Sequence, residues 1–140
     1  MDIFAIIFAF MAGCCTAVEQ TINGRLGQAV TPGVATLHNL ATGAVLLVIL
    51  NLCRGNIANY ARITSISPFY LFGGLFGAAI VYLSARAVPI LGVTKTLALV
   101  ITGQLLCGLA SDIIANGLHV NVSRWIGAVL LLIGSYMMIR

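Results

Sequence analysis

Residues 33–52, GVATLHNLATGAVLLVILNL, contain no Asp, Glu, Lys or Arg. A helix of roughly 20 predominantly apolar residues crosses the hydrocarbon core of a bilayer, and this segment has that length. Its apolar residues do not alternate with polar ones, as they would in a strand of a membrane barrel. A helix also satisfies all its backbone hydrogen bonds within lipid. The segment therefore predicts a transmembrane helix.

The rest of the chain has the same character. It has 140 residues, of which 61% are hydrophobic and only 7% are charged, whereas a soluble domain is typically about 25% charged. Four further apolar segments cover residues 3–23, 69–88, 93–111 and 123–139. The first lacks the positive flank of a signal peptide, so we expect it to be retained. The sequence predicts an all-α membrane protein: one domain, 1–140, with five transmembrane helices.

The connections are predicted at polar residues, glycine and proline. The first follows Asn23, and the longest polar stretch ends at Pro68, which suits the first turn of a helix. Pro89 is expected to interrupt the chain before a tight connection at Gly92. Residues 112–121 form the last predicted connection.

Basic residues are scattered over these connections, which indicates interfacial anchors rather than nucleic-acid binding. The predicted spans divide them four against three: Arg25, Arg86, Lys95 and Arg140 on one side, and Arg54, Arg62 and Arg124 on the other. So small a bias does not fix an orientation. One orientation can win weakly, or the spans can be misassigned. Alternatively, copies insert both ways and pair as an antiparallel homodimer with ten spans, like the inverted repeats of transporters.

No cofactor or enzymatic motif is present. The four cysteines, Cys14, Cys15, Cys53 and Cys107, lack metal-ligand spacing, so neither a metal site nor a disulfide is expected. The chain has no phosphate-binding loop of an ATP-driven pump, no H-E-x-x-H and no G-x-S-x-G. We therefore predict that the protein is not an enzyme. We expect the lipid bilayer to be its principal partner.

Small residues recur at helical spacing in the third segment, where Gly73 and Gly77 form a G-x-x-x-G pair and Gly74 and Ala78 repeat it. This spacing lets helix backbones approach closely in lipid. We expect packing within the chain rather than a seam between two copies.

Polar groups inside predicted spans are costly in lipid and indicate function by default. Thr16, Gln20 and Asn23 share one helical face, with Glu19 about 100° around the helix from Gln20. Leaving water disfavours the charged form of a carboxyl group, so Glu19 can bind a cation or a proton in turn. The alternative is that Glu19, close to the end of its span, lies among the headgroups and is exposed to water.

Three other positions carry weaker signals. Gln104 is expected to form a hydrogen bond to another helix, a role that does not exclude substrate contact. His38 is a further candidate for proton binding, although a neutral histidine bonded to another helix is the simpler interpretation. Asp112, at the end of the fourth segment, is assigned a structural interfacial role.

An ordered set of motifs carries a family resemblance. It consists of Gln20-Thr-Ile-Asn-Gly-Arg-Leu-Gly27, Gly73-Gly-Leu-Phe-Gly-Ala78, Val88-Pro-Ile-Leu-Gly92, Gly103-Gln-Leu105, Asp112 and Gly127. In order and spacing it resembles the YdcZ-type family of the drug/metabolite transporter superfamily over nearly the whole chain. The resemblance implies a bacterial inner membrane protein, half of a ten-helix transporter fold that works as a dimer. In the superfamily's small multidrug resistance branch, a first-helix glutamate exchanges protons for cationic drugs.

These observations together predict a small secondary transporter: a homodimeric exporter of a small metabolite or drug-like molecule, with proton coupling as an option. Thr16, Glu19, Gln20, Asn23 and Gln104 would line its cavity, and His38 is a further candidate. Two alternatives remain open, a dual-topology ion channel and a non-transporting membrane subunit of a larger complex.

Overall fold

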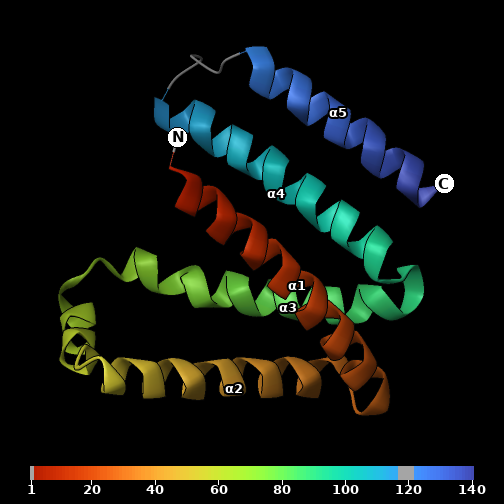
Figure 1. The fold of residues 1–140 in the computed structure, drawn as a ribbon. Coiled ribbons are helices and arrows are strands. Elements are labelled where there is room, and N and C mark those ends of the chain that lie inside the picture. The colour runs from red at the N-terminus through yellow and green to blue at the C-terminus, as the bar shows by residue number, and fades with distance from the viewer. Residues whose placement is uncertain (1, 117–121) are drawn as a thin grey trace. The chain divides into compact units, whose positions relative to one another are not determined.

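The computed structural model describes residues 2–116 and 122–140, and these form helices joined by short connections, with no strand (Figure 1). The elements are α1 (Ile3–Ala29), α2 (Pro32–Cys53), η1 (Ile57–Ser65), η2 (Pro68–Phe72), α3 (Gly73–Leu91), α4 (Val93–Asn116) and α5 (Val122–Ile139). Four stretches are long and apolar enough to cross a membrane, and a shorter apolar helix covers Trp125–Ile139. The predicted all-α membrane fold is confirmed.

α1 continues six residues beyond Asn23, where the sequence predicted its span to end. Polar residues do not stop a helix, and the real stop is the Thr31-Pro32 pair. The Thr31 side chain accepts a hydrogen bond from the Val34 amide at 3.2 Å, and Pro32 occupies the first turn of α2. The 27 residues of α1 measure about 40 Å. Glu19 therefore lies about 15 Å from the end of its helix at Ala29.

α1 and α3 approach closely at two glycines. A Cβ placed on Gly24 would lie 2.4 Å from Cγ1 of Val88, so no larger residue fits there. At Gly27, a Cβ would lie 3.7 Å from the carbonyl oxygen of Ala85. That oxygen has no helical donor, because the residue four positions on is Pro89, which has no N–H. The bare backbone of Gly27 thus faces the carbonyl that Pro89 leaves free.

Pro89 does not interrupt α3 as the sequence predicted. The helix runs through it to Leu91, since neighbouring helices can compensate for a proline within a membrane helix. The break falls at Gly92, whose φ of 82° lies in the left-handed region that other residues avoid. Pro68 does begin a helix, the 3₁₀ segment η2, which leads into α3.

Within the first unit, the small residues at the start of α3 do not show the close packing that the sequence predicted for them. A Cβ added to Gly73, Gly74 or Gly77 would meet nothing within 4 Å. Close approach on α3 instead occurs near its other end, at Ala85 and Val88. The glycine spacing indicates that a helix can pack closely, but not which part of it does.

The described residues divide into two compact units, Met1–Pro89 and Ile90–Arg140. In the second unit, α4 and α5 lie side by side (Figure 1). Ser135 of α5 bonds the hydroxyl of Thr102 on α4, and Lys95 donates to the carbonyl of Ile139 at 3.0 Å, where a cation complements the helix C-terminus. α4 continues past the predicted Ser111 to Asn116, while residues 117–121 of the predicted connection lie outside the described residues.

Few side chains are buried in either unit. The buried apolar residues among those described are Ala35, Ala85, Val88 and Ala128. Large apolar residues cover the helix surfaces, with Phe8 and Phe76 each 68% exposed. Such surfaces need lipid or another protein around them, as in a multi-pass membrane protein.

Candidate functional site

The first unit contains a carboxylate held by two amides. Asn39 of α2 donates from Nδ2 to Oε1 of Glu19 at 2.6 Å, and Asn23, one turn along α1, donates to the same oxygen at 3.4 Å. Among the described residues, no cationic side chain forms an ion pair with Glu19. Arg86, on α3, instead lies 5.9 Å from the ring centre of Tyr82. The two amides therefore fix the carboxyl group without neutralising it.

A groove of about 440 Å³ opens on one side of Glu19, between α1 and α2. Its lining is mainly apolar and includes three polar side chains, those of Glu19, Asn23 and Asn39. The other lining residues are Cys14, Cys15, Val18 and Ile22. A groove of this size and composition suits the apolar body of a small molecule, and its few polar groups can orient that molecule.

A much smaller polar cavity lies on the other side of Glu19, between α1 and α3, with a volume of about 20 Å³. It is lined by Thr16, Glu19, Gln20, Asn23, Ile80, Val81 and Ser84. Gln20 and Asn23 are 4% exposed and Ser84 is 5% exposed. Glu19 and Asn23 line both this polar cavity and the groove, so the carboxyl group lies where the two meet.

Gln20 is unusual among these side chains. Both Oε1 and Nε2 of its amide are fully buried, and neither has a hydrogen-bond partner. An unsatisfied buried polar group costs about 1–3 kcal/mol. Since such groups are rare in native proteins, the amide of Gln20 is the polar group beside this cavity that most needs a physical explanation.

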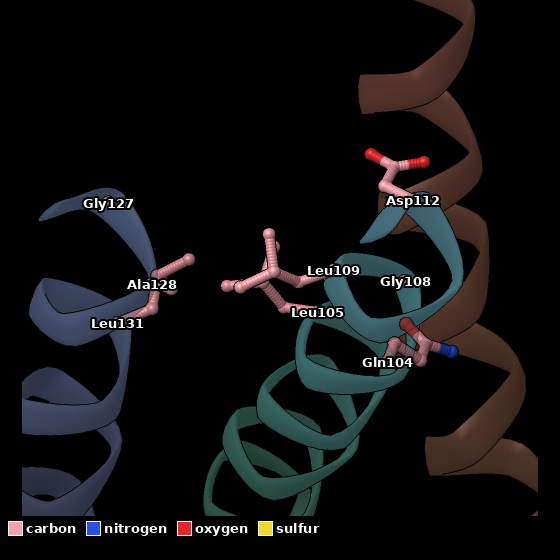
Figure 2. Close-up of a pocket in the computed structure, with 8 residues that line it drawn as sticks. All are labelled: Gln104, Leu105, Gly108, Leu109, Asp112, Gly127, Ala128 and Leu131. Carbon is pink, nitrogen blue, oxygen red and sulfur yellow. The ribbon is translucent and has the colours of Figure 1, made fainter. Parts of the chain in front are cut away.

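The second unit has a separate hollow of about 500 Å³ between α4 and α5 (Figure 2). Leu105 and Leu109 point toward Ala128 across it, whereas the Gln104 side chain extends from the other side of α4. Asp112 lies at one end of the same lining. This hollow is apolar on its α5 side.

A third hollow, of about 840 Å³, lies between α2 and η1. Its polar groups are the amides of Asn51, Asn56 and Asn59 and the hydroxyl of Tyr60. It contains no carboxylate and no histidine, so it offers no group that could exchange a cation.

The structure brings together four of the predicted site residues, Thr16, Glu19, Gln20 and Asn23, around the polar cavity. His38 is exposed and lines none of these hollows. Gln104 and Asp112 lie in the other unit, and their part in a common site stays a prediction.

Sequence reasoning missed two contributors, Asn39 and Ser84. Asn39 carried no prediction of its own, yet it lies four residues after Ala35, which is fully buried. Ser84 precedes Ala85, also fully buried. For Asn39, its helical spacing from the small residue Ala35 is a signal that could have found it, whereas the sequence carries no such signal for Ser84.

Comparison with known proteins gives one family and one relative. Residues 4–137 match the family described as "Putative inner membrane exporter, YdcZ". The chain is 28% identical over 138 residues to "Inner membrane protein YdcZ" of Escherichia coli (strain K12), which covers 95% of this chain and 93% of that protein. No solved structure gives a significant match.

Proposed function

The chain belongs to the YdcZ family of inner membrane exporters, and from this premise we propose that it is a small secondary exporter that exchanges its substrate for a cation bound at Glu19. Family membership establishes a multi-pass inner membrane protein of a transporter family, not an enzyme. The carboxyl group of Glu19, bonded by Asn39 and without an ion-pair partner among the described residues, is the observation that carries the proposal.

Exchange follows from the charge of this group. A carboxylate inside a membrane span is costly unless a positive charge neutralises it. A proton does so in the simplest case, and a positively charged substrate group does so in turn. Because both occupants need the same carboxylate, binding of one releases the other. This competition couples their movements in opposite directions.

The groove beside Glu19 suits the substrate class. Val18, Ile22 and the two cysteines, Cys14 and Cys15, supply apolar surface, and Glu19 and Asn39 supply polar groups. A molecule with an apolar body and one polar or cationic group would place the body in the groove and that group at Glu19. This arrangement supports export of a small metabolite or drug-like molecule.

Everted inner membrane vesicles test the exchange. Respiration acidifies such vesicles, and a pH-sensitive dye reports loss of the gradient when a probe enters in exchange for protons. We would add ethidium, tetraphenylphosphonium and the neutral compound chloramphenicol in turn. At least one probe should dissipate the gradient in vesicles with the wild-type protein and not in vesicles with Glu19→Gln.

Asp2→Asn is the matched control, because Asn keeps the cap on α1, where Asp2 accepts from the Phe4 amide at 3.3 Å, while removing a carboxylate. Full activity of Glu19→Gln, or no response to any probe, contradicts the proposal.

The proposed working unit is a homodimer, antiparallel if both insertions occur. Five helices per copy give the ten helices of the transporter fold that the superfamily implies, and the exposed apolar helix faces leave room for a partner. A single cysteine added after Arg140, in a background with the four exposed native cysteines replaced, measures the sidedness of the C-terminus. Labelling from both sides supports the antiparallel dimer, and labelling from one side only excludes it.

A further inference from the structure

We propose that the polar cavity between α1 and α3 is a binding site for one dehydrated Na⁺ ion. This inference rests on the proposed function, because it adds a second ion that can occupy Glu19 besides the proton. The buried amide of Gln20, without a hydrogen-bond partner in a cavity bordered by an uncompensated carboxylate, is the observation that carries it.

The ligand chemistry of the cavity fits a hard monovalent cation. Its five polar side chains, those of Thr16, Glu19, Gln20, Asn23 and Ser84, each carry at least one oxygen. Hard cations prefer oxygen ligands, and protein oxygens can replace the hydration shell of an ion within a membrane. In transporters with broken helices, unwound backbone carbonyls coordinate the coupling Na⁺, so protein oxygens can hold this ion within a membrane.

The hydrogen bonds leave several of these oxygens available. The Thr16 hydroxyl donates to the Ala12 carbonyl at 2.9 Å, which leaves its oxygen free to accept. Asn23 uses its Nδ2 for Glu19, so its Oδ1 remains unused by that bond. Both amide donors to Glu19 bond Oε1, and the described residues give Oε2 no bond.

Charge and size select the ion. Glu19 is the one carboxylate of the cavity, so a single positive charge neutralises it. No group of three or more His, Cys, Asp or Glu that could hold a metal occurs in the described part of the chain, which disfavours transition metals and highly charged ions. The volume of about 20 Å³ admits one small ion or one water molecule. The sequence expectation of no metal came from cysteine spacing, whereas this site is built of oxygens.

Water is the competing occupant. One water molecule could satisfy both Oε1 and Nε2 of Gln20, which a cation cannot do alone. Water leaves an ionised Glu19 uncompensated, whereas a cation neutralises it, and charge costs more than a neutral hydrogen bond in a span. The ion is therefore favoured in the state in which Glu19 carries no proton.

Carbodiimide labelling tests the site without a known substrate. Dicyclohexylcarbodiimide adds to protonated carboxyl groups in apolar surroundings, and a bound cation blocks the reaction. The chain has only three acidic residues, so peptide mass spectrometry can follow Glu19 alone. The full-length protein in detergent would be labelled at one fixed pH in NaCl, KCl or choline chloride of equal ionic strength.

Na⁺ at roughly ten times its dissociation constant should slow labelling of Glu19 about tenfold, and choline should not slow it. Gln20→Met and Ser84→Ala should still be labelled but should need about 10- to 100-fold more Na⁺ for protection. Thr21→Val is the control on the same helix: its hydroxyl bonds the Ala17 carbonyl at 2.8 Å and does not line the cavity, so protection should be unchanged.

Three results overturn the inference: no protection by Na⁺, equal protection by all three salts, or undiminished protection in both cavity variants. The first two depend only on the wild-type protein, so a variant that fails to fold does not remove the test. Na⁺ protection with no exchange of any probe in vesicles would contradict the proposed function and leave the ion site intact. Proton-driven exchange without Na⁺ protection would contradict the ion site and leave the proposed function intact.

Discussion

Gly24 is the position where the structure makes its sharpest prediction. In Gly24→Ala the new Cβ would lie 2.4 Å from Cγ1 and 2.9 Å from Cβ of Val88. Carbon atoms attract at about 3.5–4.0 Å, so the overlap exceeds roughly 1 Å. Val88 is β-branched and stiff at χ1, and it cannot rotate out of the way cheaply. We expect this overpacking to lower the unfolding free energy by about 3 kcal/mol. The higher helix propensity of alanine offsets roughly 1 kcal/mol of that loss.

The net loss for Gly24→Ala is therefore about 2 kcal/mol of unfolding free energy. Circular dichroism during SDS titration in mixed micelles measures it. Gly13→Ala on the same helix, with nothing within 4 Å of its Cβ, should be neutral or stabilising by roughly 0.5–1 kcal/mol. Adding Val88→Ala should restore much of the loss, with a coupling energy of at least about 1 kcal/mol. If Gly24→Ala matches Gly13→Ala, or Val88→Ala gives no rescue, the close approach of α1 and α3 is wrong.

Three further changes test other contacts. Gly92→Ala forces a side chain into a φ of 82° and should lower the unfolding free energy by about 1–2 kcal/mol in the same titration. Ser135→Ala breaks the hydroxyl pair with Thr102 and should lower the unfolding free energy by about 0.6 kcal/mol. Because Ser135 also bonds the Ala98 carbonyl, a double-mutant cycle with Thr102→Val isolates the contribution of the hydroxyl pair. Asn39→Leu removes the 2.6 Å donor to Glu19 and should reduce probe-driven proton exchange in everted vesicles by at least about tenfold, since a misplaced group can cost that much.

Each of these has a contradicting result. Gly43→Ala, in α2 with nothing near its Cβ, is the control for Gly92, and equal stability of the two variants would refute the left-handed turn. Additive losses in the Ser135 cycle would mean that the hydroxyl pair contributes nothing. Full exchange by Asn39→Leu would show that Glu19 needs no positioning from α2.

The helices were predictable because lipid imposes a simple rule on the sequence. Each apolar segment of sufficient length must hydrogen-bond its own backbone, so hydropathy alone predicts the elements. Their ends were less predictable, because they depend on neighbours. α1 continues past Asn23 to the stop at Thr31-Pro32, and α3 accommodates Pro89 beside the bare backbone of Gly27.

The sequence predicted some of the residues of the candidate site but not all of them. Thr16, Glu19 and Gln20 stood out because polar groups are costly in a span. The shorter of the two hydrogen bonds to Glu19 comes from another helix, at Asn39. Which residue of α2 or α3 faces Glu19 depends on how the helices cross, and a single sequence does not encode that crossing locally. Asn39 was therefore recognised only from its hydrogen bond to Glu19 in the structure.

Purified protein in proteoliposomes tests the central claim, exchange at Glu19, most directly. The liposomes would carry an imposed pH gradient and the probe that responds in vesicles, with wild-type protein, Glu19→Gln or Asp2→Asn at equal density. We predict gradient-driven probe flux with the wild type and Asp2→Asn, and none above empty liposomes with Glu19→Gln. Equal flux through the wild type and Glu19→Gln would contradict the assignment of Glu19 as the exchanging group.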